Sequence, residues 1–127
     1  ARGVTPKGAI SMTPLAQHIY QQLRRRLRSK RPSITYAELA NSLDYRFSTH
    51  PRSRRLFAAL TEVSLACRER DLPCLPAIVW RSGVRRPSTG YYKIAHPRAR
   101  TEAARLAAWQ REHARVLHDA TQFPTSL

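Results

Sequence analysis

The sequence predicts an α+β domain that is mostly α-helical, and three observations point to it. Apolar residues recur at helical spacing in four stretches, which are bounded by capping residues or prolines. Leu75 to Trp80 and Tyr91 to Ala95 are rich in β-forming residues and flank a polar segment, which predicts a β-hairpin with a long basic tip. The elements then follow the order of a winged helix-turn-helix, with three helices and a β-hairpin wing, here extended by a C-terminal helix.

The first two helices are predicted from their N-terminal signals. Thr13 and Pro14 are typical of the N-cap and the first position of a helix. A very short strand is predicted after that helix. Thr35 and Glu38 then form the capping box of a short second helix, in which each side chain satisfies a free backbone N–H group.

The later helices are longer and set the domain boundaries. The third is predicted from about Pro51 to Arg70, with Ser48 or Thr49 as its cap, and the fourth from Thr101 to Ala120. The sequence therefore predicts one domain between two flanking segments. Its parts are a flexible N-terminal segment at 1–12, a winged-helix-like domain at 13–121 and a frayed C-terminal tail at 122–127.

The charge of the chain indicates the class of its partner. The 127 residues include 23 Lys and Arg against 8 Asp and Glu, which gives a formal net charge of +15, while 42% are hydrophobic. That hydrophobic fraction supports a folded core, so the charge belongs to a domain rather than to a disordered basic tail. A polyanion, above all duplex DNA, is the expected partner. The sequence indicates no oligomeric state.

No membrane partner and no targeting signal are expected. The chain has no apolar run of the roughly 20 residues that a bilayer-spanning helix needs. Its two cysteines, Cys67 and Cys74, fall on predicted apolar stretches and are expected to be buried, reduced thiols. We therefore expect cytoplasmic action, or delivery to a target-cell cytoplasm if the chain is a toxin fragment.

The basic residues most informative about function lie at the start of the third predicted helix. Arg52, Arg54 and Arg55 crowd an end that already carries about half a positive charge from the helix dipole. Such crowding is unfavourable unless an anion binds, and a recognition helix enters the major groove with this end. A merely solvated arginine face is the alternative.

Two further basic clusters lie at the end of the first helix and at the tip of the predicted hairpin. A run as dense as the first is typical of contacts with the phosphate backbone, which carry no sequence specificity. Tyr36 could stack on an unpaired base, although such aromatic residues are more often part of a core. The residues predicted to bind nucleic acid are Arg24, Arg25, Arg28, Arg31, Tyr36, Arg52, Arg54, Arg55, Arg81, Arg85, Arg86 and Lys93.

One stretch of the chain resembles a known family. Ile34 to Ala40 reads ITYAELA and precedes an arginine-headed helix and the apolar run from Leu72 to Val79. This resembles the DNA-binding half of the O6-alkylguanine-DNA alkyltransferases and alkyltransferase-like proteins, which have a TYGELA-type helix start and an Arg-Ala-Val-Gly recognition helix. The chain also resembles a group of small uncharacterised bacterial proteins that share the TYxELA start.

The resemblance implies DNA binding without the repair chemistry of that family. Trp80 to Gly83 stands where the family has its Pro-Cys-His-Arg acceptor motif, so the acceptor cysteine is absent. By resemblance, Arg54 or Arg55 corresponds to the intercalating arginine. Tyr36 matches the tyrosine that supports the flipped nucleotide.

No motif for metal or cofactor chemistry is present. The sequence contains no HExxH, P-loop or GxSxG pattern, so neither a metal site nor a cofactor is predicted. His50 and His96 remain candidates for metal-free acid–base catalysis. The leading hypothesis is a non-catalytic double-stranded DNA-binding protein. The alternatives are a nucleic-acid-targeting toxin or effector enzyme excised from a larger protein, and an RNA- or ribosome-binding protein.

Overall fold

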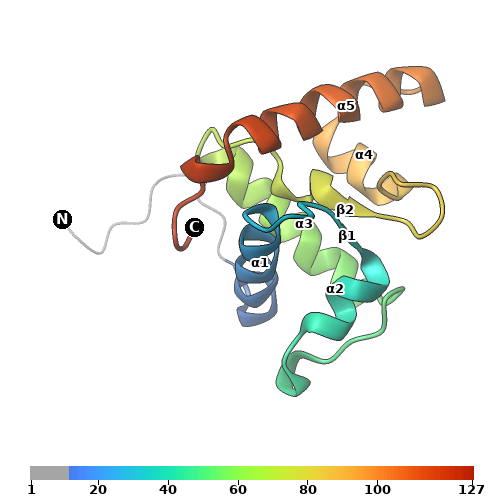
Figure 1. Ribbon diagram of the computed structural model, residues 1–127. Helices are drawn as coiled ribbons and strands as arrows, with labels where there is room; N and C mark the ends of the chain where they lie inside the picture. The colour runs from blue at the N-terminus through green and yellow to red at the C-terminus, as the bar shows by residue number, and fades with distance from the viewer. Residues whose placement is uncertain (1–11) are drawn as a thin grey trace.

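The computed structural model describes residues 12–127, so nearly all of the expected flexible segment 1–12 lies outside the described residues (Figure 1). The described chain is rich in α-helix with one small sheet, as the sequence predicts. Its helices are α1 (Pro14–Leu27), α2 (Tyr36–Ser42), α3 (Arg54–Glu69), α4 (Thr89–Ala95) and α5 (Glu102–His118). Its strands are β1 (Ile34–Thr35) and β2 (Val79–Trp80), and short 3-10 turns lie at Tyr45–Phe47, Leu75–Ile78 and Ala120–Gln122.

The predicted caps of the first two helices are confirmed. The Thr13 hydroxyl accepts a hydrogen bond of 3.2 Å from the Ala16 amide at the start of α1. At α2 the Glu38 amide donates to the Thr35 hydroxyl, and the Thr35 amide donates to the Glu38 carboxylate over 3.0 Å. Both helices therefore begin where their side chains can replace the missing backbone partners.

The third helix begins later than predicted. Neither Ser48 nor Thr49 caps it, because the backbone first makes a separate turn in which the Ser53 amide donates to the His50 carbonyl over 3.0 Å. Ser53 is the N-cap, and its hydroxyl accepts from the Leu56 amide. Arg52 consequently precedes α3 instead of lying in its first turn.

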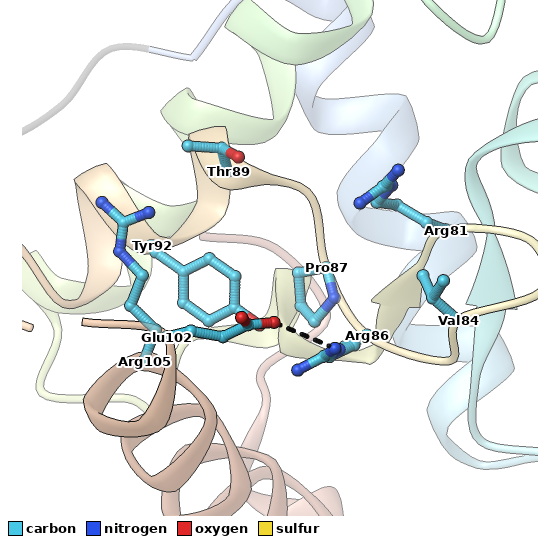
Figure 2. Close-up of a pocket in the computed structure, with 8 residues that line it drawn as sticks. All are labelled: Arg81, Val84, Arg86, Pro87, Thr89, Tyr92, Glu102 and Arg105. Atoms are coloured by element: carbon cyan, nitrogen blue, oxygen red, sulfur yellow. Dashed lines mark hydrogen bonds and ion pairs between the residues drawn. The ribbon is translucent and has the colours of Figure 1, made fainter. Parts of the chain in front are cut away.

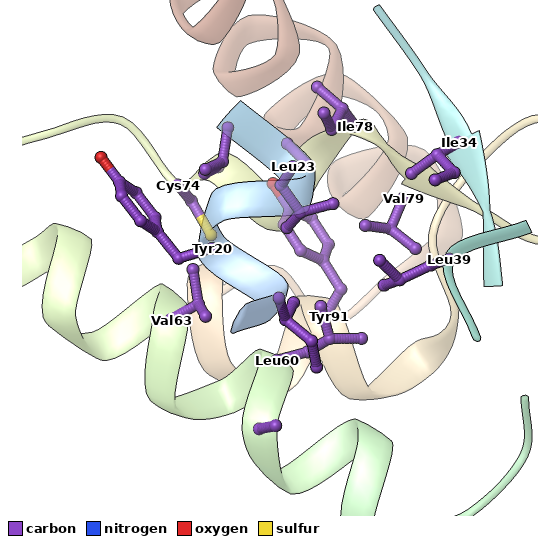
Figure 3. Close-up of a cluster of buried hydrophobic side chains, with 14 of the residues drawn as sticks. Tyr20, Leu23, Ile34, Leu39, Leu60, Val63, Cys74, Ile78, Val79 and Tyr91 are labelled. Carbon is purple, nitrogen blue, oxygen red and sulfur yellow. The ribbon is translucent and has the colours of Figure 1, made fainter. Parts of the chain in front are cut away.

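The core lies between α1, α3 and the turn Leu75–Ile78. Helices α1 and α3 pack side by side, and the turn packs against both of them and against α5. Figure 3 shows buried side chains such as Leu23, Val63 and Ile78 converging from these three elements. Helix α5 lies across one side of the molecule, and α2 lies at the opposite side (Figure 1).

The predicted β-hairpin wing is wrong. The two strands pair in parallel, with Ile34 opposite Val79, and Tyr91 to Ala95 forms most of α4 instead of a returning strand. Tyr91 and Tyr92 are adjacent and both buried, whereas adjacent residues of a strand point to opposite faces. The basic segment 81–88 is thus a loop between a strand and a helix.

The predicted fraying of the C-terminal tail is also wrong. Phe123 is only 1% exposed and belongs to the core. Backbone carbonyls around it accept hydrogen bonds from α1: that of Phe123 from the Arg24 side chain, that of Pro124 from the Tyr20 hydroxyl and that of Thr125 from Gln21. The tail therefore docks along α1.

Candidate nucleic-acid interface

The N-terminus of α3 presents uncompensated positive charge. Arg54 and Arg55 are the first two residues of the helix and are exposed, while the Leu56 side chain anchors this turn in the core. Arg52, in the preceding turn, is exposed as well. Within residues 12–127 none of the three guanidinium groups forms an ion pair, and the first turn of α3 has no acidic residue. The positive end of the helix dipole therefore adds to three free cations.

Tyr36 links the start of α3 to the basic loop 81–88. The centre of its ring lies 5.2 Å from the centre of the Phe57 ring, which belongs to the first turns of α3. Its hydroxyl donates to the Ser88 hydroxyl over 3.1 Å and accepts from the Ser88 amide over 3.0 Å. Burial raises the pKa of Tyr36, and the hydrogen bonds with Ser88 and then the nearby Arg81 guanidinium oppose that shift. Tyr36 thus holds the loop beside α3, and its hydroxyl is occupied within the chain.

The basic loop is a defined turn. The Arg81 amide donates to the Arg86 carbonyl over 2.9 Å and closes it. Gly83 has a φ of 85°, and Arg85 has a φ of 55°, a left-handed conformation that costs a residue with a Cβ about 1–3 kcal/mol. The Arg81 and Arg85 side chains are exposed, whereas Arg86 lies 3.2 Å from Glu102. The loop therefore presents the Arg81 and Arg85 side chains at the surface.

The basic cluster at the end of α1 lies elsewhere. The positive charges of Arg24 and Arg28 favour ionisation of the Tyr20 hydroxyl, and so does that of Arg70, the C-cap of α3. Burial raises the pKa of Tyr20 to about 12, and the three guanidiniums oppose that shift. Because α3 has 16 residues, its two ends lie roughly 24 Å apart. The structure therefore separates this cluster from the N-terminus of α3.

The other predicted contacts lie on α1, in the segment that follows it, and on α4. Arg25 and Arg31 are exposed. The pKa of Glu38 is lowered chiefly by the hydrogen bond from the Thr35 amide, and the positive charge of Arg31 lowers it further. Lys93 is exposed on α4. The structure thus joins two of the three predicted basic regions, the start of α3 and the loop 81–88.

The two candidate histidines differ in their surroundings. His50 is exposed, and its Nδ1 accepts from the Arg52 amide over 3.1 Å, a contact that shapes the turn before α3. His96 is half-buried, and its Nε2 lies 2.8 Å from the Tyr91 hydroxyl. It lines a cleft of about 390 Å³ with Glu112 and Arg115 among its other residues. Burial lowers the pKa of His96, which favours the neutral imidazole.

The cysteines are free and buried, as predicted. Burial raises the pKa of Cys67 to about 11 and that of Cys74 to about 12, so neither is a reactive thiolate at neutral pH. The Cys74 thiol lies 3.3 Å from the Ser64 hydroxyl. In the described part of the chain, no three His, Cys, Asp or Glu side chains come together as a metal site would require.

Sequence reasoning missed a pocket of about 310 Å³ between the basic loop, α4 and the start of α5 (Figure 2). Arg81 and Arg86 line it from the loop, and Arg105 and Glu102 line it from α5. No pattern in the sequence indicates that Arg105 approaches residues of the loop. Their proximity follows only from how α5 packs.

Comparison with known proteins finds no matching family model, no matching curated protein and no matching solved structure. None of the helices within residues 12–127 has the length and apolarity required to cross a bilayer. The function must therefore be argued from the residues and their arrangement.

Proposed function

We propose that the chain is a non-catalytic protein that binds double-stranded DNA through the N-terminus of α3 and the adjacent basic loop. The observation that carries this proposal is the concentration of free positive charge at the start of α3, on Arg52, Arg54 and Arg55, where the helix dipole makes it least favourable. A bound polyanion removes that penalty.

In this proposal α2 and α3 act as a helix-turn-helix pair, and the loop 81–88 takes the place of a hairpin wing. The exposed side chains at the start of α3 enter the major groove, as the recognition helix of such a pair does. Arg81 and Arg85 contact the phosphate backbone beside it. Tyr36 supports this surface by its contacts with Phe57 and Ser88.

Substitution of the two helix-start arginines tests the proposal. The Arg54→Ala/Arg55→Ala variant should bind a duplex at least roughly 30-fold more weakly than the wild type, since each lost contact costs about 1–3 kcal/mol. Gel-shift titrations on duplex DNA, single-stranded DNA and duplex RNA measure the affinities. A preference for duplex RNA would instead support the RNA-binding hypothesis.

The matched control removes the same charge elsewhere. Arg98 and Arg111 are exposed, and within the described residues neither forms an ion pair. The Arg98→Ala/Arg111→Ala variant should bind DNA with nearly the affinity of the wild type. Equal losses in both double variants would show that net charge alone governs binding, and would refute the assignment of α3.

A second candidate function, nucleic-acid cleavage or nucleotide modification, is favoured by the cleft around His96. A neutral imidazole beside Glu112 and cationic side chains can act as a general base in phosphate chemistry. Incubation of the protein with labelled DNA or RNA, with and without divalent metal, tests this. Our leading proposal predicts intact substrate; product that forms with the wild type and is lost in His96→Ala would establish the enzyme.

A further inference from the structure

The pocket between the basic loop and α5 has features of a small-molecule site that the proposed DNA surface does not require. Its volume of about 310 Å³ lies at the lower end of the range of ligand pockets. Figure 2 shows Tyr92 and Pro87 in its middle, with Arg81 on one side and Arg105 on the other. The pocket is thus lined mainly by polar groups, with cations around a smaller apolar surface.

The positive charge in this pocket exceeds the negative charge. Its lining includes the guanidiniums of Arg81, Arg86 and Arg105 and the single carboxylate of Glu102. Glu102 lies 3.2 Å from Arg86, but its side chain is 82% exposed. An ion pair this exposed is worth little, so a stronger anion can displace the carboxylate.

Arg105 is held in place before any ligand arrives. Its Nε donates to the Ala99 carbonyl over 3.1 Å, and its guanidinium carbon lies 5.7 Å from the centre of the Tyr92 ring. The Nε contact leaves the two terminal nitrogens of the guanidinium for other acceptors. A fixed guanidinium fork loses less entropy on binding a phosphate than a mobile side chain does.

We propose that this pocket binds the phosphate group of a small phosphate monoester. The Arg105 guanidinium holds the phosphate oxygens, and Arg86, on the other side of the Tyr92 ring, adds positive charge once the Glu102 carboxylate, which occupies it in the free protein, moves to solvent. The apolar wall formed by Val84, Pro87 and Tyr92 contacts the organic part of the ligand.

Calorimetric titration of the full chain, without nucleic acid, tests this with adenosine monophosphate, adenosine and inorganic phosphate as probes. Adenosine monophosphate should bind at least about tenfold more tightly than adenosine, because adenosine lacks the charge-assisted hydrogen bonds. Tighter binding than inorganic phosphate would show that the wall contributes. Equal affinity for the nucleotide and for inorganic phosphate would overturn the assignment of the wall, and no binding of either would overturn the site.

Three variants locate the site. Arg105→Gln should weaken nucleotide binding about tenfold or more, and Glu102→Gln should strengthen it severalfold because it removes the competing carboxylate. Arg111→Gln, which removes an exposed charge from the same helix, should leave it unchanged. Weaker binding in Glu102→Gln, or equal losses in Arg105→Gln and Arg111→Gln, would refute the proposal. Arg105 and Glu102 belong to neither the proposed DNA surface nor the His96 cleft, so failure here is distinct from failure of DNA binding.

Discussion

At the scale of single residues, two buried ring nitrogens have no hydrogen-bond partner within the described chain: Nε1 of Trp80 and Nε2 of His113. The centre of the His113 ring lies 5.8 Å from that of the Trp80 ring and 5.3 Å from that of the Trp109 ring. Trp109 differs from its neighbours because its Nε1 donates to the Ala77 carbonyl over 2.9 Å. Burial lowers the pKa of His113, so the neutral imidazole is the form that fits against the two indoles.

This burial predicts a loss of stability at acidic pH. When the pH falls below the ordinary histidine pKa of 6.5, His113 of the unfolded chain binds a proton before His113 of the folded chain does. The free energy of unfolding must therefore decrease as the pH falls through this range. Urea unfolding at pH 7.5 and pH 5.0 should show a larger decrease for the wild type than for His113→Phe.

The pH range separates this effect from that of Glu38. The pKa of Glu38 is lowered chiefly by its hydrogen bond from the Thr35 amide, so its contribution to stability is lost only at lower pH, below its ordinary value of 4.5. His96, whose pKa burial also lowers, is unchanged in both proteins and does not alter their difference. Equal decreases in the wild type and in His113→Phe would show that His113 titrates normally in the folded chain.

At the scale of elements, the sequence predicts what local chemistry determines. The Thr13 cap and the Thr35–Glu38 capping box act within four residues, so their patterns alone are sufficient. The sequence predicts a strand at Tyr91 to Ala95, most of α4, because aromatic residues are enriched in strands. The segment is helical because it packs against α3 and begins at the turn at Ser88. A pattern of seven residues predicts neither of these features.

The C-terminal tail provides a direct test of packing at this scale. Because Phe123 is buried at 1% exposure, Phe123→Ala should lower the free energy of unfolding by about 3 kcal/mol, as large-to-small substitutions in a core do. Gln122→Ala, at an exposed neighbour, should change it by less than about 0.5 kcal/mol. Chemical denaturation measures both. A similarly small effect at Phe123 would show that the tail is frayed, as the sequence suggests.

At the scale of the whole molecule, the arrangement of the basic regions was beyond prediction. The sequence shows which arginines cluster along the chain, but not which clusters share a surface. That depends on the parallel pairing of β1 with β2, which places the segment after Trp80 beside α2, and on the contact of Tyr36 with Ser88. The cluster on α1 instead faces the C-terminal end of α3, near Arg70.

This arrangement predicts how strongly DNA binding depends on salt. Each phosphate neutralised by a cation contributes about −0.9 to the slope of log affinity against log salt concentration. The proposed surface holds five exposed guanidiniums, so the slope should be about −4 to −5 if each one contacts a phosphate. They are those of Arg52, Arg54, Arg55, Arg81 and Arg85.

If the cluster on α1 contacted the same duplex, three further exposed guanidiniums, those of Arg25, Arg28 and Arg31, would steepen the slope to about −7. Affinities for a short duplex at four or more salt concentrations measure it. The triple variant Arg25→Ala/Arg28→Ala/Arg31→Ala should keep the wild-type slope, because these three residues lie outside the proposed surface. A wild-type slope near −7 that the triple variant reduces would show that DNA spans both ends of α3, and the interface would then have to be redrawn to include α1.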